Sequence, residues 1–410
     1  MQDRLRRDAQ TIIDETLRAA LPDAAVERAL CGRTFPGRVF MVAIGKAAWQ
    51  MANTAYKVLS GNICDGIVIT KHGHAKGKIG ALRIREGGHP VPEAANFEAT
   101  REALEITAGL CAQDTVLFLV SGGGSALFES PVISEQELTD VTGQLLASGA
   151  DIVEMNTVRK RLSHVKGGRF ALHCAPAQVL SIILSDIVGD PLDMIASGPA
   201  YPDSSTSQEA LAVCTRYAIR LSDAAAEALA HETPKKLDNV ETVVTGSVRH
   251  LCESAESTAR RLGYQTVLLT DSMNCIAREA GRFLGAIGRT HASPPEPLAY
   301  IAGGETVVKL SGKGKGGRNQ EIALAGAAEL AGVPDCALFS VGSDGTDGPT
   351  DAAGGYVNGD TAKRLAEKGV SIAGVLLQND AYPALQAVDG LIITGPTGTN
   401  VNDFSVLLLR

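Results

Sequence analysis

Short apolar runs that alternate with helix-length segments are the feature that most constrains how this chain of 410 residues can fold. The run at 115–120 is apolar almost throughout, as in strands that are buried on both faces of a parallel sheet. Similar runs predict further strands at 38–44, 66–71, 81–85 and 179–184. Helices are expected after residue 45 and at 93–110, 134–147, 152–162 and 208–217. This alternation predicts right-handed crossovers and an α/β/α layered domain with a mostly parallel sheet.

The second half of the chain predicts a second α/β domain, with a mixed sheet. Strands are expected at 241–244, 265–269, 298–302, 306–310, 337–341 and 391–393. Two adjacent strands flank Gly303, Gly304 and Glu305, which is typical of a tight turn or hairpin. A polar stretch at 231–239 separates the two halves, so the predicted domains span residues 1–235 and 236–410.

Composition excludes several classes of protein. The hydrophobic content of 45% and the charged content of 20% are typical of a soluble globular protein. The net charge of −8 argues against general binding to nucleic acid or to an anionic membrane. Eight cysteines without a CxxC pair indicate a reducing, cytoplasmic location. The first residues have the pattern of an amphipathic helix rather than a signal peptide, and no apolar run is long enough to span a membrane.

A lysine–glycine turn, defined as residues 312–317, lies between the expected strand at 306–310 and an expected helix at 321–330. Glycines allow backbone N–H groups to converge on an anion, and a helix N-terminus adds a favourable partial charge. Arg318 follows the turn, where its guanidinium can hold two oxygens at once. We therefore expect phosphate contacts from this segment. The candidates are Lys313, Gly314, Lys315, Gly316, Gly317, Asn319 and Gln320.

Three carboxylates follow the next expected strand, and they belong to Asp344, Asp347 and Asp351. A cationic cradle and a carboxylate loop, each at the carboxyl end of a strand, are what a phosphate group and a divalent cation need. These acids are therefore candidate metal ligands. Glycine and aspartate also favour ordinary turns, which is the alternative interpretation of both segments.

Further candidates lie beyond the carboxyl ends of expected strands in the first half, where α/β sheets bind ligands. Lys46 follows the first strand and can contact an anion as a point charge. A glycine turn follows the strand at 115–120 and can offer its N–H groups to a ligand oxygen. It comprises Ser121, Gly122, Gly123, Gly124 and Ser125. The alternatives are a solvated lysine and a close contact between helix and sheet.

Two groups of polar residues complete this candidate site. Asn156 and Lys160 lie four residues apart on one face of an expected helix, although a solvated face is the usual interpretation of such a pattern. Asp186 and Asp190 lie in a loop rich in glycine and proline after the strand at 179–184. One of these acids can cap a helix, and another can act as a catalytic base or metal ligand.

Other motifs are absent or point to different chemistry. The P-loop, the protein-kinase motifs and the GxSxG elbow are missing. The glycines of 312–317 satisfy GxGxxG, which keeps a dinucleotide-dependent reductase open, although Asp344 lies later than the acid that this motif requires. His72, His74 and His89 are close in sequence and can bind a metal in principle, but their loop needs no metal to explain it.

Taken together, the motifs resemble the class II glycerate 2-kinase family. They occur in order over nearly the whole chain: GKAA at 45–48, GGHPVPE at 87–93, SGGGSAL at 121–127, NTVRKRLSHVKGGR at 156–169, SDIVGDPLDMIASGP at 185–199, GGETVVKL at 303–310, GGRNQE at 316–321, SDGTDGPTDAAGG at 343–355 and GPTGTNVNDF at 395–404. The resemblance implies an N-terminal Rossmann-like domain, a C-terminal MOFRL domain and an active site in the cleft between them.

The resemblance also implies a reaction, in which ATP phosphorylates the 2-hydroxyl of D-glycerate with the help of Mg²⁺ or another divalent cation. The products are 2-phosphoglycerate and ADP. Lys46 and Arg318 are then the best catalytic candidates, and Asp186 or Asp190 can accept the hydroxyl proton. Some members are labelled hydroxypyruvate reductase, so an NAD(P)H-dependent reductase is the main alternative and a non-enzymatic nucleotide-binding regulator a weaker one. A homo-oligomer is compatible with the sequence.

Overall fold

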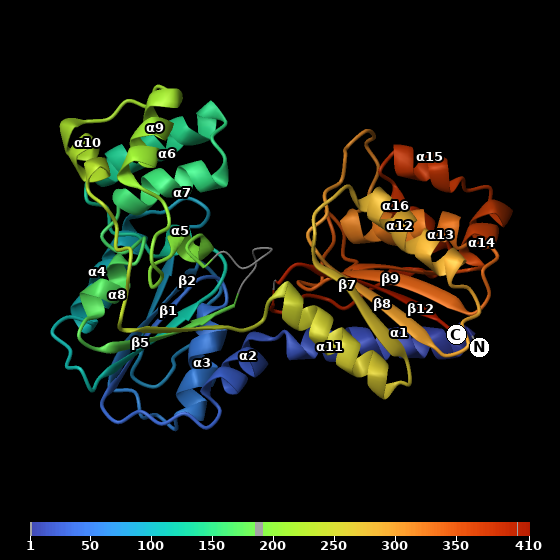
Figure 1. Ribbon diagram of the computed structural model, residues 1–410, viewed down its shortest axis with the longest axis horizontal. Helices are drawn as coiled ribbons and strands as arrows, with labels where there is room; N and C mark the ends of the chain where they lie inside the picture. The colour runs from blue at the N-terminus through green and yellow to red at the C-terminus, as the bar shows by residue number, and fades with distance from the viewer. Residues whose placement is uncertain (1, 185–191, 400) are drawn as a thin grey trace. The chain divides into compact units, whose positions relative to one another are not determined.

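The computed structural model describes residues 2–184, 192–399 and 401–410, which fall into two compact units (Figure 1). The N-terminal unit contains residues 26–184 and 192–245. The C-terminal unit contains residues 2–25 and the described chain from 246 onward. No helix in the described ranges is both long enough and apolar enough to cross a bilayer, and all eight cysteines are free thiols.

The N-terminal unit is built around six parallel strands in the order β3-β2-β1-β4-β5-β6. They are β1 (Val39–Ile44), β2 (Asp65–Lys71), β3 (Arg83–Gly87), β4 (Thr115–Val120), β5 (Gln178–Ile183) and β6 (Val240–Val244). Both β1 and β4 are buried along their whole length, as their apolar sequences predict. This is the strand order of the doubly wound Rossmann fold, which reverses between β1 and β4. The predicted layered domain is therefore confirmed.

Helices cover this sheet and add a helical layer. They are α2 (Pro22–Leu30), α3 (Ala48–Val58), α4 (Ala94–Ile106), α5 (Gly124–Leu127), α6 (Glu135–Ser148), α7 (Ile152–Arg161), α8 (Arg169–Cys174), α9 (Ser207–Arg216) and α10 (Asp223–Ala230). Apolar residues of α4, α6, α7, α9 and α10 pack into one buried cluster. Figure 1 shows α6, α7, α9 and α10 side by side at one end of the unit. The helices expected in this half are confirmed, with slightly different ends.

The C-terminal unit contains a mixed sheet in the order β11-β10-β9-β12-β8-β7. Its strands are β7 (Gln265–Met273), β8 (Leu298–Gly304), β9 (Cys336–Gly342), β10 (Gly354–Asn358), β11 (Leu391–Ile392) and β12 (Asp403–Leu409). β12 is antiparallel to both of its neighbours, β8 and β9, whereas β7 and β8 are parallel. The expected mixed sheet is confirmed.

The route of the chain through this sheet differs from the prediction. Residues 306–310 form no strand apart from an isolated bridge between Val307 and Ile276. The hairpin expected at 303–305 is therefore wrong, because the antiparallel neighbour of β8 is β12 from the end of the chain. Neither β12 nor β10 was assigned from the sequence. The pairing of β12 with β8 joins segments far apart in the chain and depends on tertiary contacts, which cannot be predicted from local periodicity.

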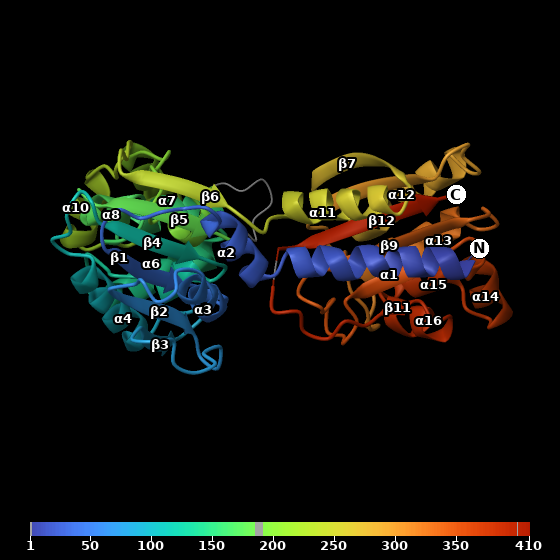
Figure 2. The same cartoon turned by 90° about the horizontal axis from the view of Figure 1, so that it is seen from below.

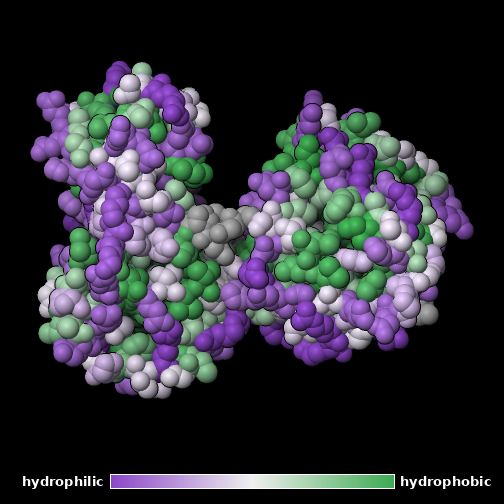
Figure 3. Space-filling view, in the orientation of Figure 1, coloured by the Kyte–Doolittle hydropathy of each residue, from purple (hydrophilic) through white to green (hydrophobic). Residues whose placement is uncertain are grey.

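Helices of the C-terminal unit pack on both faces of its sheet. They are α1 (Gln2–Ala19), α11 (Val248–Arg261), α12 (Ala277–Thr290), α13 (Arg318–Glu329), α14 (Thr361–Glu367), α15 (Ile372–Leu377) and α16 (Ala381–Ala387). Figure 2 shows α1 and α11 running along one face of the sheet, and α1 also packs on β9. Figure 3 shows apolar residues gathered on the visible surface of this unit.

The ends of the two units do not coincide with the predicted boundary at 235/236. The Tyr264 hydroxyl donates to Asp8 Oδ2 at 2.7 Å, and Arg410 Nη2 donates to the same oxygen at 2.8 Å. These buried contacts place α1 in the C-terminal unit. β6, expected in the second domain, is instead the parallel neighbour of β5 in the first sheet.

Candidate active site

The first candidate site lies where the strand order of the N-terminal sheet reverses. β1 and β4 are parallel neighbours, so the turns that follow them lie together. The Lys46 N–H donates to the Gly122 carbonyl oxygen at 2.8 Å, and the Ala47 N–H donates to Ser121 Oγ at 3.0 Å. The structure thus brings Lys46 and the glycine turn at 121–125 together, and Ser121 holds the two turns in contact.

The glycine turn leaves backbone donors free. Within the described ranges, the N–H groups of Gly122, Gly123 and Gly124 donate no hydrogen bond. Gly123 has a φ of 87°, and a Cβ there would lie 2.9 Å from His89 Cδ2. A Cβ on Gly124 would lie 2.6 Å from Ala196 Cβ. The turn therefore requires glycine for close packing, and it also presents N–H groups that an anion can accept from.

Positive charge gathers beside this turn. Lys46 is partly exposed, and its ammonium has no hydrogen-bond or ion-pair partner among the described residues. Burial lowers the pKa of His89, which adjoins Gly123, and the charges of Lys46, Lys71 and His74 lower it further. The sequence suggested a rigid loop or, less favoured, a metal ligand for His89, and it did not predict a place beside the glycine turn. The GGHPVPE motif was the signal that pointed to this histidine.

The histidines considered as metal ligands are used separately. His72 Nε2 lies 2.5 Å from Glu93 Oε1, and His74 Nδ1 lies 3.0 Å from the Lys46 carbonyl oxygen. In the part of the chain that the structure describes, no three His, Cys, Asp or Glu side chains are arranged to hold a metal ion. These contacts agree with the interpretation of this segment as an ordinary loop.

Buried side chains support the glycine turn from inside the unit. Ser125 Oγ lies 2.9 Å from Ser197 Oγ, which donates to Asn156 Oδ1 at 2.9 Å. Lys166 Nζ and Arg159 Nη2 both donate to the Ser125 carbonyl oxygen, at 2.9 and 3.2 Å. Asn156 therefore acts on the turn through two serines, and the face of α7 that carries it is buried rather than solvated.

Lys160 has a different place from the one its pattern suggested. Its side chain is fully buried, and Nζ lies 3.0 Å from an oxygen of Asp203 and 3.2 Å from one of Asp193. An ammonium that is enclosed and paired in this way holds the structure together and is not presented to a ligand. Asp186 and Asp190, the acids proposed for catalysis, lie outside the described residues.

The second candidate site lies at the start of α13 in the C-terminal unit. Arg318 donates to both carboxylate oxygens of Asp403, at 2.6 and 3.1 Å, and to Glu305 Oε1 at 2.8 Å. Burial disfavours the guanidinium cation, but the two acids outweigh this effect and raise the pKa of Arg318. Burial raises the pKa of the Asp403 carboxyl, and the charge of Arg318 opposes it. Asp403 was not predicted, although it lies in the motif at 395–404.

Part of the lysine–glycine turn does not offer the free N–H groups that its sequence suggested. The N–H groups of Gly312, Gly314 and Lys315 donate to oxygens of residues 378–380 at 2.8–2.9 Å. A Cβ on Gly312 would lie 2.3 Å from Gln378 Cα. These glycines therefore allow two segments of the same unit to approach closely.

The side chains of this turn remain available. Lys313 and Lys315 are exposed, and Lys315 Nζ lies 4.1 Å from the centre of the Tyr382 ring. This distance is typical of a cation–π contact. Gly316 and Gly317 line the cavity described below.

Asn319 and Gln320 are buried and hold the acid loop, defined as residues 344–351, rather than a ligand. Their backbone N–H groups donate to the Asp347 carboxylate at 3.1 and 2.9 Å, and their side-chain amides donate to it at 3.3 and 3.0 Å. Burial raises the pKa of Asp347, and these hydrogen bonds oppose that shift. Asp347 therefore caps the first turn of α13, where a carboxylate is favoured.

The three predicted metal ligands do not form a common group. Asp344 is partly exposed, and its Oδ1 accepts from the Thr346 N–H at 2.9 Å. Asp351 is exposed and accepts from the Tyr382 hydroxyl at 2.7 Å, which lowers the pKa of the carboxyl. Because Asp347 serves as a helix cap, residues 2–184, 192–399 and 401–410 contain no three-carboxylate metal site of the predicted kind.

A cavity of about 740 Å³ opens beside Arg318 in the C-terminal unit. Its walls come from the segment after β8, the lysine–glycine turn, the start of α13, the acid loop and the segment before α16. The lining residues are Thr306, Val307, Val308, Leu310, Gly314, Gly316, Gly317, Arg318, Glu321, Asp344, Thr346, Asp347, Gly348, Pro349 and Asn379.

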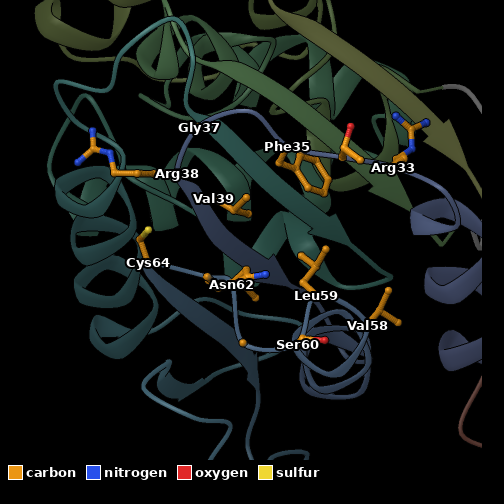
Figure 4. A pocket seen from close by; sticks show the side chains of 13 residues that line it. Arg33, Phe35, Gly37, Arg38, Val39, Val58, Leu59, Ser60, Asn62 and Cys64 are labelled. Carbon is orange, nitrogen blue, oxygen red and sulfur yellow. The ribbon is translucent and has the colours of Figure 1, made fainter.

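A cavity of about 850 Å³ lies at the opposite edge of the N-terminal sheet, before β1 and after α3 (Figure 4). The guanidinium groups of Arg33 and Arg38 lie on opposite sides of it. Arg33 binds Glu241, and Arg38 binds Asp114. This cavity lies at the amino end of the sheet with its cations already paired, so it lacks the features of an anion site.

Comparison with protein families gives two matches that together span most of the chain. A family described as "Domain of unknown function (DUF4147)" matches residues 8–230, and the MOFRL family matches residues 298–403.

Comparison with individual proteins gives matches over nearly the full length. A D-glycerate 2-kinase of Thermotoga maritima is 49% identical over 99% of this chain and 98% of its own length. A human glycerate kinase is 33% identical over 99% of this chain and 93% of its own. A protein of Agrobacterium vitis that is provisionally named a hydroxypyruvate reductase is 37% identical over 98% of this chain and 94% of its own. The crystal structure of the Thermotoga maritima glycerate kinase superposes with a TM-score of 0.94 over 99% of both chains.

Proposed function

We propose, since the chain belongs to the class II glycerate 2-kinase family, that it catalyses the transfer of the γ-phosphoryl group of ATP to the 2-hydroxyl of D-glycerate. The products are 2-phosphoglycerate and ADP. Two relatives named glycerate 2-kinase, at 49% and 38% identity, match nearly the whole chain, and the protein labelled hydroxypyruvate reductase is 37% identical.

The geometric observation that carries this proposal is the anion site at the β1–β4 switch point. Three glycine N–H groups and the Lys46 ammonium, all without a partner among the described residues, belong to two turns that are in contact there. Both substrates of the reaction are anions, and phosphoryl transfer depends on positioning and on compensation of charge rather than on covalent chemistry. A turn of this kind supplies both requirements.

Each unit contributes one proposed catalytic cation. Lys46 in the N-terminal unit is without a partner among the described residues, so its long side chain can follow a carboxylate or phosphate oxygen. Arg318 in the C-terminal unit is fixed by Asp403 and Glu305 and is preorganised. Asp186 or Asp190 is the proposed base for the 2-hydroxyl proton, a role that requires hydrogen-bond reach of that hydroxyl.

A divalent cation is proposed to arrive with the nucleotide. The predicted carboxylates do not form a protein cage, as the contacts of Asp347 and Asp351 show. Mg²⁺ commonly binds one or two carboxylates together with substrate phosphates, and it needs no dedicated cage. We assign no catalytic step to it.

The reductase alternative loses its structural basis at the GxGxxG segment. A dinucleotide fingerprint follows a strand and offers its backbone to the pyrophosphate. In this chain no strand is formed at 306–310, and N–H groups of the turn are bound by residues 378–380.

One assay separates the two functions. Purified protein is mixed with D-glycerate and either ATP with Mg²⁺ or NAD(P)⁺. The expected product is 2-phosphoglycerate, followed by coupling to enolase, without formation of NAD(P)H. Formation of NAD(P)H without any ATP-dependent product would reject the kinase and support the reductase.

A further inference from the structure

The cavity beside Arg318 has the size of a nucleoside site. Its volume of about 740 Å³ falls within the range of about 300–1,000 Å³ in which pockets enclose most of a drug-sized ligand. A three-carbon acid would leave most of this space to water. A base with its ribose is of the size that such a cavity encloses.

One wall of the cavity is apolar and uncovered. The side chains of Val307 and Leu310 are 55% and 80% exposed, and they line the cavity together with Val308 and Pro349. Covering such apolar side chains is favourable because it removes their surface from water. The flat face of a heterocyclic base can cover them, whereas glycerate carries a charge and two hydroxyls and cannot.

The same cavity contains polar atoms in need of partners. Thr306 is 2% exposed, and its Oγ1 has no hydrogen-bond partner in the described part of the chain. A buried hydroxyl in that state carries a desolvation cost, which a donor or acceptor on a ligand relieves. Asp344 uses one carboxylate oxygen to accept from Thr346, and its second oxygen can accept from ribose hydroxyls.

Charge indicates which end of a nucleotide enters. The cavity is lined by the acids Glu321, Asp344 and Asp347 and by one cation, Arg318, which already binds Asp403. Such a lining disfavours phosphates, which carry several negative charges, but it accepts the N–H and O–H donors of a base and ribose.

The phosphates have a separate place at the edge of the cavity. Lys313 and Lys315 are exposed and alternate with Gly314 and Gly316, which line it. Their ammonium groups can therefore reach the phosphates of a nucleotide whose base lies inside.

We propose that this cavity binds the base and ribose of the phosphate donor, with its phosphates along the lysine–glycine turn. The small hydroxy acid then binds at the glycine turn beside Lys46. The inference rests on the proposed function and deepens it, because it assigns each substrate to one unit of the chain.

The test measures binding without turnover. Isothermal titration calorimetry with ADP and, separately, with D-glycerate is carried out on the wild-type protein and on Leu310→Asp. The aspartate carboxylate on the apolar wall is expected to weaken ADP binding by about ten-fold or more, because the adenine ring would have to cover a charged group and remove it from water. D-Glycerate binding is expected to stay unchanged. Lys46→Ala is expected to weaken D-glycerate binding and to leave ADP binding unchanged.

Leu146→Asp is the matched control, because Leu146 is 64% exposed on α6 of the other unit and does not line the cavity. Melting temperatures check that each variant is folded. If Leu310→Asp unfolds, Leu310→Ala replaces it, and a smaller loss of ADP affinity is expected for that variant. Unchanged ADP affinity in the Leu310 variants, or a loss of D-glycerate binding alone, overturns the inference.

ADP binding and formation of 2-phosphoglycerate are measured separately, so each can fail without the other. If the protein binds ADP with this pattern but forms no 2-phosphoglycerate, the nucleoside site stands and the kinase proposal fails. If the wild-type protein forms 2-phosphoglycerate but Leu310→Asp binds ADP normally, the kinase proposal stands and the nucleoside site fails. Absence of ADP binding to the wild-type protein rejects both.

Discussion

The two glycine turns of this chain have similar composition but differ in how many of their backbone N–H groups bind protein. In the glycine turn at 121–125, the N–H groups of Gly122, Gly123 and Gly124 donate no hydrogen bond among the described residues, although the turn packs closely on His89 and Ala196. In the lysine–glycine turn at 312–317, the N–H groups of Gly312, Gly314 and Lys315 donate to residues 378–380. A glycine-rich segment thus indicates that its backbone closely approaches another group. The packing around the segment decides whether that group belongs to the protein or to a ligand.

The two cations beside these turns show the same contrast. The Lys46 ammonium has no partner in the described chain, whereas the Arg318 guanidinium is held by two acids. A free lysine adapts to its ligand and loses side-chain freedom on binding, whereas a fixed arginine has already lost it in folding. The two sites are therefore expected to respond differently to substitution.

The largest effect is expected for Lys46→Ala. Loss of a charge contact made in the transition state typically costs about 10²–10³ in rate, and the free ammonium holds no other part of the described protein. Glycerate-dependent turnover should fall by this factor while the melting temperature barely changes. The exposed Lys57 on α3 is the matched control, since Lys57→Ala should leave both nearly unchanged. Turnover near the wild-type value in Lys46→Ala would remove this lysine from the mechanism.

Gly123→Ala tests whether the glycine turn is functional. The new Cβ would lie 2.9 Å from His89 Cδ2 and 3.4 Å from Lys46 Cγ, at a φ of 87° that alanine rarely adopts. A displacement of about 1 Å at a reacting site can cost about 10² in rate. We expect turnover to fall by roughly that factor, with a moderate loss of stability. A variant that loses stability but keeps its turnover would show that the turn only packs.

Gly312→Ala tests the opposite expectation for the other turn. Its Cβ would lie 2.3 Å from Gln378 Cα, so the two segments must separate. Overpacking of this kind typically costs about 1–3 kcal/mol of stability. Urea unfolding should show this loss, with turnover per folded molecule changed much less than in Gly123→Ala. A large loss of turnover at unchanged stability would contradict the structural role of this glycine.

The smallest effect is expected for the pH dependence of stability that arises from Lys166, which holds the glycine turn at 121–125. Burial lowers the pKa of Lys166, which donates to Ser125, to about 8 from an ordinary value of 10.5, and Glu129 opposes the shift. Between these values the unfolded chain binds a proton that the native state has released, so the free energy of unfolding rises with pH. This rise should be smaller in Lys166→Met, as measured by urea unfolding at several pH values from about 7 to about 10, which bracket the two pKa values. Equal pH dependence in both proteins would mean that Lys166 titrates normally.

Local sequence patterns were sufficient for much of the N-terminal unit. The strands β1 and β4 are short, apolar and followed by glycine or by serine and glycine, so burial and the position of their turns could both be predicted. Parallel strands place their carboxyl ends at one edge of a sheet, so the sequence predicts that Lys46 and Ser121 lie at the same edge. Only the structure shows that β1 and β4 are neighbours there. The family resemblance rested on the same segments.

Contacts between distant residues could not be predicted in this way. The pairing of β12 with β8 and β9, the return of α1 to Tyr264 and Arg410, and the place of β6 beside β5 all depend on segments far apart in the chain. Their local patterns are compatible with several partners, because periodicity reports which face is apolar but not what covers it.

The sequence by itself therefore determined the two α/β units, the parallel sheet of the first, the presence of glycine turns and the family of the chain. Only the tertiary structure decided that Asp347 caps α13, that Lys160 is enclosed by two acids and that Arg318 is fixed by Asp403. The physical reason is that a polar residue can satisfy its hydrogen bonds with protein or with ligand, and its type and spacing are the same in both cases. Folding assigns those partners, and the groups left without one mark where a substrate can bind.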